Sequence, residues 1–439
     1  QSDLYQVFQL FHPSYTNKAP GCAMQGFGNP QVTFAVESMM DEIADKLDID
    51  PIELRLMNYV GLGDTFWGQG PTVKSVVKSS GVGELLDKGS DKIGWDDRES
   101  PDEKGGRYRR GIGMARGFHT SGTGAPTPGE SVDYSSALVK INEDGTVDVV
   151  SPLQDHGGGT LNAGAKIVAE EIGVPVENVG LSPADTQTTA YDVCTHATRG
   201  VYVGGEAMRQ AAEEAKEEFK EFASRVLEVP SHAVKIEPDP ENGVGKVYVE
   251  GVPEKTTTVG EIAQIARDKD WGTAASIVSH RAVDCPPAYS AQFVEVEIDT
   301  ATGEISLERA VLGNDAGNVI NPNLARGQLH GGFYRGAGYA LLEDTTYRRD
   351  NGELVNKGYL TDYKMLTPVD LPSNDNIETF FADTEEPTGP FGAKGIGEST
   401  LNPVAAAISN AIYNAVGIRF TEIPITPEKV LKALDEKEG

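Results

Sequence analysis

Residues 391–417 read FGAKGIGESTLNPVAAAISNAIYNAVG, a glycine-rich loop followed by an almost wholly apolar segment. Apolar residues recur at helical spacing over 404–415, and Gly417 ends the run. Asn402 and Pro403 suit an N-cap and a first helical turn. The sequence therefore predicts a buried helix that begins directly after the glycine-rich loop.

One acid, Glu398, lies in this loop just before the predicted helix. Glycines in such a loop let the backbone approach a bound molecule closely. A carboxylate beside a buried apolar helix is held partly out of water, which suits it to act as a general base. The alternative interpretation is a capping or solvent-facing acid, because one acid in a glycine loop is common.

The composition is strongly acidic, since 67 Asp and Glu residues outnumber 38 Lys and Arg residues and give a formal net charge of -29. Such a charge repels polyanions and argues against a nucleic-acid or anionic-membrane partner. A length of 439 residues predicts two or three subdomains. No run of 18 apolar residues is present, so no membrane span is expected. The printed N-terminus has no signal-peptide pattern, and we expect a cytoplasmic location.

The cysteines and histidines indicate no cysteine-type metal centre. Cys22, Cys194 and Cys285 lie far apart and follow no CxxC spacing. They cannot alone hold an iron–sulfur cluster or a zinc ion, and their odd number argues against a disulfide framework. The seven histidines are scattered and form no HExxH motif.

A second glycine-rich loop, GCAMQGFGNPQ, occupies residues 21–31 and contains another Asn-Pro pair. A helix is predicted to follow it, because apolar residues recur there at helical spacing on one face. These residues are Val32, Val36, Met39, Met40, Ile43 and Leu47. A further helix is predicted near 75–90.

Two segments share one plan of hairpin, Asp/Gly loop and helix. The hairpins, their turns and the loops that follow are 132–151 with Asp144-Gly145 and 154–160, and 293–312 with Thr302-Gly303 and 315–317. Two copies suggest an internal duplication whose loops converge on one site. Independent adjacent units are the alternative.

These patterns divide the chain into four parts and predict an α+β fold with two related hairpin–helix subdomains. The parts are 1–110, with the glycine loop and helices; 111–227, the first hairpin–helix subdomain; 228–272, a small α+β excursion; and 273–439, the second hairpin–helix subdomain.

Four glycine-rich loops precede predicted helices, at 21–29, 157–160, 315–332 and 389–400. Helix N-termini and exposed backbone N–H groups bind anions. Four such loops in an acidic chain indicate a large phosphate-bearing cofactor held mainly by backbone and amide groups. The sequence has no Walker A motif and no GxGxxG between a strand and a helix, so ordinary ATP or Rossmann binding is not expected.

Several segments resemble motifs of the molybdenum hydroxylase family, in the family's order and along nearly the whole chain. They are GFGNPQ with AVESMMDEIADKLDIDPIELRLMN, QDHGGGT, DTQTTAYDVCTHATRG, GNVINPNLARGQLHGG, GAKGIGEST and ITPEKVLKAL. The family includes xanthine dehydrogenase, aldehyde oxidoreductase, nicotinate dehydrogenase and 4-hydroxybenzoyl-CoA reductase. Around YTNKAPGCAMQGFGNPQ the chain is most similar to the 4-hydroxybenzoyl-CoA reductase type.

The resemblance covers the second half of the family's molybdopterin-binding subunit and implies the xanthine-dehydrogenase type of molybdopterin-binding domain. It implies molybdopterin, as the cytosine dinucleotide, with molybdenum held by the pterin dithiolene and by no direct protein ligand. The family's GGGFGGK-type loop, iron–sulfur cysteine motifs and flavin domain are not in this sequence. A split subunit of the nicotinate dehydrogenase type, or a fragment of a large subunit, is therefore expected. Partners would carry the first half of the molybdopterin domain, a [2Fe-2S] cluster and FAD.

Glu398 matches the family's general base. The resemblance implies that it takes a proton from a hydroxyl on molybdenum, whose oxygen attacks an electron-poor substrate carbon while hydride moves to a sulfido ligand. The positions that match cofactor-binding residues are Gly157, Gly158, Gly159, Thr160, Thr195, Thr198, Arg199, Gln328, Lys394, Gly395, Ile396 and Gly397. The positions implied to line the substrate are Gln25, Phe27 and Phe118.

Two positions depart from the family pattern. Gln25 stands where the family has an arginine near the substrate, so bidentate binding of a substrate carboxylate or phosphate is not expected. Gly158 replaces a glutamine that contacts the cofactor, and His156 is a candidate substitute, although a histidine before glycines is more often a loop residue. The changes fit an unusual substrate, altered cofactor binding or a non-catalytic relative.

The sequence therefore predicts the molybdopterin-binding subunit of a molybdenum hydroxylase that acts only with a partner subunit. It would hydroxylate a small molecule, an N-heterocycle or aldehyde, with water-derived oxygen and pass electrons to iron–sulfur and flavin partners. One alternative is reductive dehydroxylation of an aryl-CoA at the same kind of site. The alternative from another class is a structural subunit that completes the complex without turnover.

Overall fold

The computed structural model describes residues 16, 18, 24–67, 74–101, 105–124, 133–355 and 358–438. The helices are α1 (Asn29–Leu47), α2 (Pro51–Met57), α3 (Val82–Ile93), α4 (Thr160–Ile172), α5 (Glu206–Leu227), α6 (Val259–Asp268), α7 (Pro322–Leu341), α8 (Val404–Val416) and α9 (Pro427–Glu438). The strands are β1 (Thr65–Trp67), β2 (Lys74–Val76), β3 (Tyr108–Thr120), β4 (Tyr134–Ile141), β5 (Val147–Val150), β6 (Val179–Ser182), β7 (Val234–Asp239), β8 (Val244–Val249), β9 (Val252–Thr258), β10 (Ala275–Arg281), β11 (Pro287–Asp299), β12 (Ile305–Asp315) and β13 (Ile377–Phe381). This mixture confirms the α+β class.

Two four-stranded sheets with the same strand order form the framework. The first runs β10-β4-β5-β6 and the second runs β3-β11-β12-β13. In each, an antiparallel hairpin has a further antiparallel strand on one side and a parallel strand on the other. A helix, α4 or α7, follows each hairpin and precedes the parallel strand. The shared plan confirms the two related hairpin–helix subdomains.

Each sheet takes one strand from a neighbouring part of the chain. β3 precedes the first hairpin in the sequence but pairs with β11 along its whole length. β10 precedes the second hairpin but pairs with β4. The predicted ranges 111–227 and 273–439 therefore each contribute one strand to the other sheet. Sequence spacing does not reveal this exchange, because the hairpin pattern reports only local pairing.

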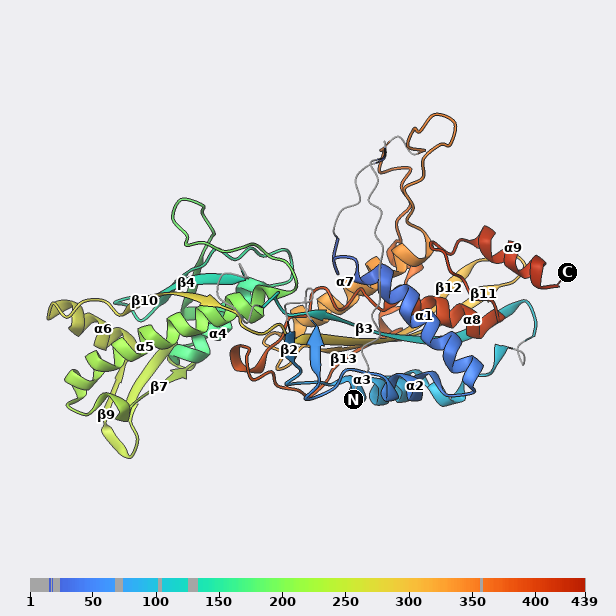
Figure 1. Ribbon diagram of the computed structural model, residues 1–439. Coiled ribbons are helices and arrows are strands. Elements are labelled where there is room, and N and C mark those ends of the chain that lie inside the picture. The colour runs from blue at the N-terminus through green and yellow to red at the C-terminus, as the bar shows by residue number, and fades with distance from the viewer. Residues whose placement is uncertain are drawn as a thin grey trace.

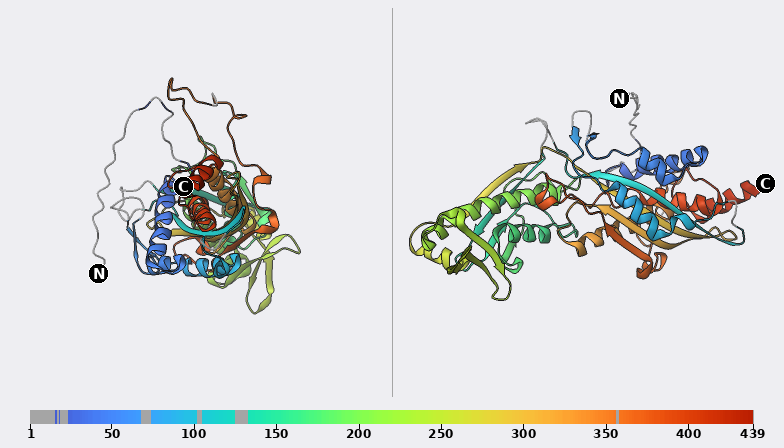
Figure 2. Two further views of the ribbon diagram at one scale, coloured as in Figure 1. Left: turned by 90° about the vertical axis from the view of Figure 1, so that its right-hand side faces the viewer. Right: turned by 90° about the horizontal axis from the view of Figure 1, so that it is seen from below.

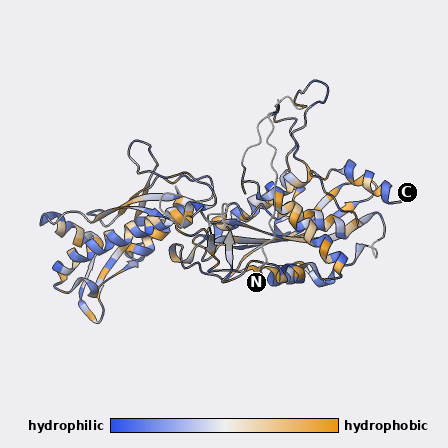
Figure 3. Cartoon of the chain, viewed as in Figure 1, coloured by the Kyte–Doolittle hydropathy of each residue, from blue (hydrophilic) through white to orange (hydrophobic). Residues whose placement is uncertain are grey.

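The two sheets lie in separate lobes of an elongated molecule (Figure 1, Figure 2). One lobe contains the first sheet with α4 and α5, and it carries a three-stranded sheet β7-β8-β9 and α6 within residues 228–272. Charged and apolar residues alternate along α5, whose apolar side is buried (Figure 3). The other lobe contains the second sheet with α1, α3, α7, α8 and α9. Among the described residues, no helix combines the length and the apolar run needed to cross a bilayer.

α8 is the central helix of the second lobe and packs its backbone closely against β3. A Cβ atom at Gly113 of β3 would lie 2.0 Å from the Ala411 nitrogen, so only glycine fits there. The buried helix predicted from the sequence is confirmed, but its predicted cap is wrong. Pro403 occupies the N-cap position, and the Asn402 amide instead donates to the Phe118 carbonyl at 2.8 Å.

α3 begins at Val82, later than the helix predicted near 75–90, because β2 occupies residues 74–76. β2 pairs with β1 in a short antiparallel ribbon. The apolar side of α3 then packs against β11, where Leu85 and Leu86 contact a core that includes Phe293. α3 therefore covers the side of the second sheet opposite α8.

α1 packs on the second lobe through a mixed face that contains two buried acids. Glu37 and Asp41 are buried, and both pair with Arg55 of α2, which is fully buried. The Arg55 Nε atom lies 2.6 Å from Glu37 Oε2, and its other nitrogen lies 2.7 Å from Asp41 Oδ1. Burial lowers the pKa of Arg55, but the two carboxylates outweigh this effect and the pKa is raised overall. This buried triad joins α1 to α2.

Replacing Arg55 with methionine should destabilise the protein strongly. The change removes the cation that the two buried carboxylates share, a loss of about 3–5 kcal/mol in the free energy of unfolding. Urea unfolding followed by circular dichroism measures it. The control is Lys46→Met, which removes only the exposed pair with Glu42 and should not shift the midpoint measurably. Equal midpoints for the two variants would contradict a structural role for the triad.

Candidate functional site

The Glu398 carboxylate is the point where segments distant in the sequence meet. Its side chain is 16% exposed. The Gly26 backbone N–H donates to its Oε1 at 3.2 Å, and the Thr198 hydroxyl donates to its Oε2 at 3.1 Å. A carboxylate oxygen can accept two hydrogen bonds. Among the described residues, each oxygen thus has one hydrogen-bond donor and keeps a lone pair with which to take a proton.

Gln25 ties the first glycine loop to the Glu398 loop. Its amide nitrogen donates to the Gly397 carbonyl. Arg335, on α7, donates to the Gln25 amide oxygen at 2.6 Å. A guanidinium therefore lies beside position 25 although the residue there is a glutamine. Sequence reasoning missed Arg335, because nothing in the sequence relates this position of α7 to residue 25.

Phe118, near the end of β3, lies beside the same loop. Its carbonyl accepts from the Asn29 amide at 3.1 Å and from the Asn402 amide at 2.8 Å. Its ring meets Tyr289 edge-on, with centroids 6.4 Å apart. The Phe27 ring is 67% exposed. The structure thus brings the predicted substrate-side positions to one place, with the Phe27 ring open to solvent.

His119 is a buried neighbour of Glu398 that sequence reasoning missed. Its Nδ1 atom lies 3.6 Å from Glu398 Oε2 and 3.1 Å from the Thr120 carbonyl. The shorter contact indicates that Nδ1 carries a proton and donates it to that carbonyl. The longer one exceeds hydrogen-bonding distance. A histidine at the end of a strand, directly after a predicted substrate-lining aromatic, was the only signal for this position.

Gln328 and two glycine segments line the space beside the Glu398 loop. A Cβ atom at Gly158 would lie 3.5 Å from the Gln328 Nε2 atom, and one at Gly397 would lie 3.7 Å from its Oε1 atom. The backbone around Gly157 has a φ of +88°, and its Cβ position faces open space. Two predicted cofactor segments, around Gly158 and Gly397, therefore lie next to the Gln328 amide.

The loop before α4 is shaped by one aspartate. Asp155 Oδ1 accepts the backbone N–H groups of Gly157 and Gly159 at 2.9 and 3.0 Å. Gly159 has a φ of +75° and packs directly on Leu324 of α7, where a Cβ atom would lie 2.1 Å from that side chain. This packing brings Thr160, the first residue of α4, toward the start of α7. His156, the candidate substitute for the family's glutamine, is exposed.

A small pocket lies between these segments, and the groups around it can be compared with those that a phosphate-bearing pterin needs. Its lining includes Gly158, Gly159, Ile396 and Leu324. Among the described residues, the backbone N–H groups of Ile396 and Gly397 find no acceptor. The Ile396 N–H lies in this lining, and the Gln328 amide and the Gly397 N–H lie beside it. Groups of this kind bind anions. The residues present therefore fit a phosphate-bearing pterin.

The segment that contains Thr198 is held in a strained conformation. The φ angles of Ala197 and Thr198 are +45° and +55°, a region that a β-branched residue rarely adopts. Gly395 lies directly against Thr198, and the Ala197 carbonyl accepts from the Gly122 N–H at 2.6 Å. These contacts hold the backbone in a conformation in which the Thr198 hydroxyl donates to Glu398.

Arg199 is fully buried and binds its own segment. Its Nε atom lies 2.5 Å from Asp133, and a second nitrogen lies 2.9 Å from Asp192 and donates to the Cys194 carbonyl. Burial lowers the pKa of Arg199, but the hydrogen bonds and charges of the two aspartates raise it overall. Arg199 positions the segment around the half-exposed Thr195.

Lys394 is buried and anchors the Glu398 loop to the core. Its ammonium donates to Asp315 at 2.8 Å and to the Ser79 and Pro287 carbonyls at 3.3 Å each. An ammonium has three donors, and all three are used. Asp315 also accepts from the Gly81 N–H at 2.8 Å. Lys394 therefore has no donor left for a ligand.

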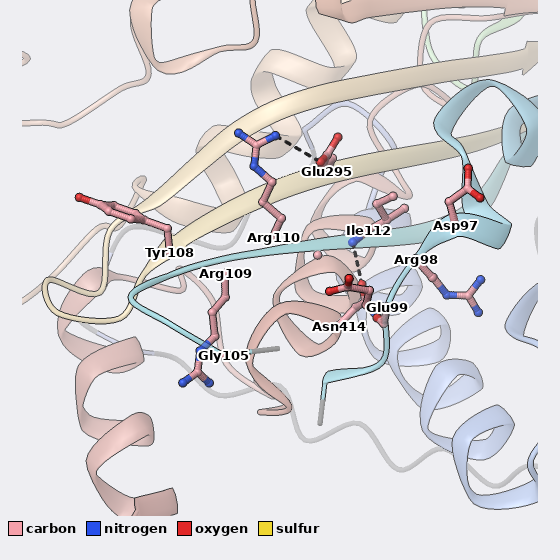
Figure 4. A pocket seen from close by; sticks show the side chains of 11 residues that line it. Asp97, Arg98, Glu99, Gly105, Tyr108, Arg109, Arg110, Ile112, Glu295 and Asn414 are labelled. Carbon is pink, nitrogen blue, oxygen red and sulfur yellow. Dashed lines mark hydrogen bonds and ion pairs between the residues drawn. The ribbon is translucent and has the colours of Figure 1, made fainter. Parts of the chain in front are cut away.

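A separate polar pocket lies at the other end of β3 (Figure 4). Arg109, Arg110 and Asn414 line it, and Arg110 points toward Glu295 (Figure 4). A strand rises about 3.3 Å per residue, so Arg110 lies about 30 Å from His119. This pocket belongs to neither the Glu398 nor the Gln328 group.

Replacing Gly395 with alanine should break the contact between the Glu398 loop and the Thr198 segment. The added methyl group would lie 2.2 Å from Thr198 atoms, including backbone oxygen. We expect a loss of about 1–3 kcal/mol in the free energy of unfolding. Thermal unfolding measures this effect.

Gly83→Ala is the matched control, because a Cβ atom at this exposed position of α3 meets nothing within 4 Å. It should leave the free energy of unfolding unchanged or raise it slightly. Unchanged stability of Gly395→Ala would contradict the close contact.

Comparisons with known proteins identify a family for this chain. Two family models described as "Molybdopterin cofactor-binding domain" match residues 88–372 and 7–59. The putative xanthine dehydrogenase molybdenum-binding subunit of Escherichia coli (strain K12) is 34% identical over 420 residues, which are 95% of this chain and 54% of that protein. The aldehyde oxidoreductase of Megalodesulfovibrio gigas is 30% identical over 95% of this chain and 42% of that protein.

A solved structure shows the same fold. The crystal structure of quinoline 2-oxidoreductase from Pseudomonas putida 86 superimposes with a TM-score of 0.85 at 27% identity. The match covers 96% of this chain and 54% of that chain. The present chain thus spans about half the length of the relatives that it matches.

Proposed function

We propose a function from one premise: the chain belongs to the molybdenum hydroxylase family of molybdopterin cofactor-binding proteins. In this proposal it is the second half of a molybdopterin-binding subunit that hydroxylates a small molecule with oxygen from water. The observation that carries the proposal is the meeting at Glu398 of the Gly26 N–H and the Thr198 hydroxyl, beside the Gln328 amide.

The cofactor would be held by backbone and amide groups. The residues proposed to contact it are Gly157, Gly158, Gly159, Thr160, Thr195, Thr198, Gln328, Gly395, Ile396 and Gly397. When bound, molybdopterin, as the cytosine dinucleotide, supplies the two-electron redox chemistry of the reaction. Arg199 and Lys394, whose donors bind the protein itself, would serve the cofactor by holding these segments in place.

Glu398 would act as the general base. Its two hydrogen bonds fix the carboxylate in one orientation, and each oxygen retains a lone pair for the proton that the reaction releases. Its low exposure limits competition from water. The same groups would stabilise the carboxylate again once the proton has moved on.

An N-heterocycle or an aldehyde is the proposed substrate class. The named relatives include a putative xanthine dehydrogenase subunit, an aldehyde oxidoreductase and a quinoline oxidoreductase. Phe27 and Phe118 would offer aromatic faces to a planar substrate. The pair of Gln25 and Arg335 would line the same side with an amide and a guanidinium.

The proposed assembly supplies the part of the relatives that this chain does not span. One partner polypeptide would carry the first half of the molybdopterin domain and form the other wall of the site. Further subunits would carry the [2Fe-2S] cluster and FAD and receive the electrons. A cytoplasmic location remains part of this proposal.

The direct test is Glu398→Gln in the assembled complex. Glutamine keeps the shape and size of the side chain but cannot take the proton, so kcat should fall about 100- to 10,000-fold. Bound molybdenum should be retained, as measured by metal analysis of the same sample. The control is Glu385→Gln, an exposed acid that should leave kcat unchanged.

Normal turnover of Glu398→Gln would exclude the base role. A native complex that contains no molybdenum and shows no turnover would instead favour the structural-subunit interpretation. The departures at Gln25 and Gly158 would then be its explanation.

A further inference from the structure

α1 is oriented opposite to an ordinary amphipathic helix. The side that faces the protein contains Glu37 and Asp41, both buried and paired with Arg55. Only Pro30, Phe34 and Ala44 add apolar contact on that side. Most of the large apolar residues of α1 lie on the opposite face, which is turned to solvent.

The apolar residues of α1 are largely exposed. The exposed fractions are 58% for Val32, 50% for Val36, 59% for Met39, 37% for Ile43 and 58% for Leu47. Their spacing of three and four residues places them in one stripe about a quarter of the helix circumference wide. The sequence prediction placed these residues and Met40 on one face. Met40 is half-buried, but the other five are exposed, so this face is not in the core. We call Val32, Val36, Met39, Ile43 and Leu47 the α1 stripe.

The α1 stripe leads to the candidate site. Met24 and Phe27, which are 54% and 67% exposed, directly precede the helix. The loop that contains them donates to Glu398 through Gly26. α1 itself lies at the outer edge of the second lobe (Figure 2). A polypeptide seated on the stripe would thus also reach the open side of the Glu398 loop.

A regular stripe of this kind is not an ordinary surface feature. Single exposed apolar residues are normal, but a continuous row of large ones marks an interaction surface. A helix presents such a row when a groove or another helix covers it. The interior of the protein does not do so here, because the opposite face makes those contacts.

We propose that the α1 stripe is the docking surface for the polypeptide that corresponds to the part of the relatives this chain does not span. The chain covers 54% of the related molybdenum-binding subunit and 54% of the quinoline oxidoreductase chain. The remainder is large enough to form a domain with its own apolar surface. The inference rests on the proposed function, because it takes that remainder to be the partner that completes the site.

The experiment measures binding of that remainder, taken from the same source and produced as a separate tagged polypeptide. The test variant is Val36→Glu with Met39→Glu, two exposed changes that keep good helix formers in α1. We expect at least a 100-fold rise in Kd, with an unchanged circular dichroism spectrum. The control is Ile277→Glu on β10, a 64% exposed residue of the other lobe, which should leave Kd unchanged.

Hydrogen exchange gives a second readout that needs no variant. Amides of residues 31–47 should exchange more slowly in the complex than in the free chain. An unchanged Kd for the double variant, or unchanged exchange in this helix, would overturn the proposal. Self-association of the wild-type chain that the double variant abolishes would assign the stripe to a second copy and also overturn it.

Binding is measured without cofactor or turnover, so this test fails separately from the proposed function. A complex that forms through the α1 stripe but never takes up molybdenum would support the docking proposal and contradict the proposed catalytic function.

Discussion

The buried ion pair between Lys394 and Asp315 is the constraint on which the site depends. Both side chains are fully buried, and all three N–H groups of the lysine ammonium donate to other groups of the protein. Asp315 ends β12 and also binds the backbone that begins α3. A buried charge without its partner is costly, so neither residue can leave this arrangement alone. The loop from Gly395 to Glu398 therefore starts from a fixed point in the second lobe.

From that fixed point, the loop joins the two lobes. Gly395 lies against Thr198, and the strained Thr198 backbone turns its hydroxyl to Glu398. Arg199 holds the same segment through two aspartates of the first lobe. The carboxylate is thus positioned by residues that are about 200 and 370 positions away in the chain. Strain of this kind persists only where several contacts enforce it, as at a functional site.

Much of this arrangement was predictable from the sequence where the signal is local. The hairpins, the buried helix after Glu398 and the glycine loops follow from spacing and turn chemistry. The exchange of β3 and β10 was not predictable, because strand pairing between distant segments leaves no periodic mark. Arg335 and His119 were missed because their contacts with Gln25 and Glu398 join segments that are distant in the sequence. The helix that begins at Asn29 was predicted correctly. Periodicity shows that its apolar residues share one face, but it does not show whether that face packs on the core or is exposed.

We propose that the loops around Glu398 and Gln328 hold a molybdenum cofactor. The most direct measurement is an anomalous difference map, recorded at the molybdenum absorption edge from crystals of the assembled native complex. One strong peak is expected in the space between the Glu398 carboxylate and the Gln328 amide. A molybdenum peak elsewhere in the assembly, or none in a complete native complex, would contradict it.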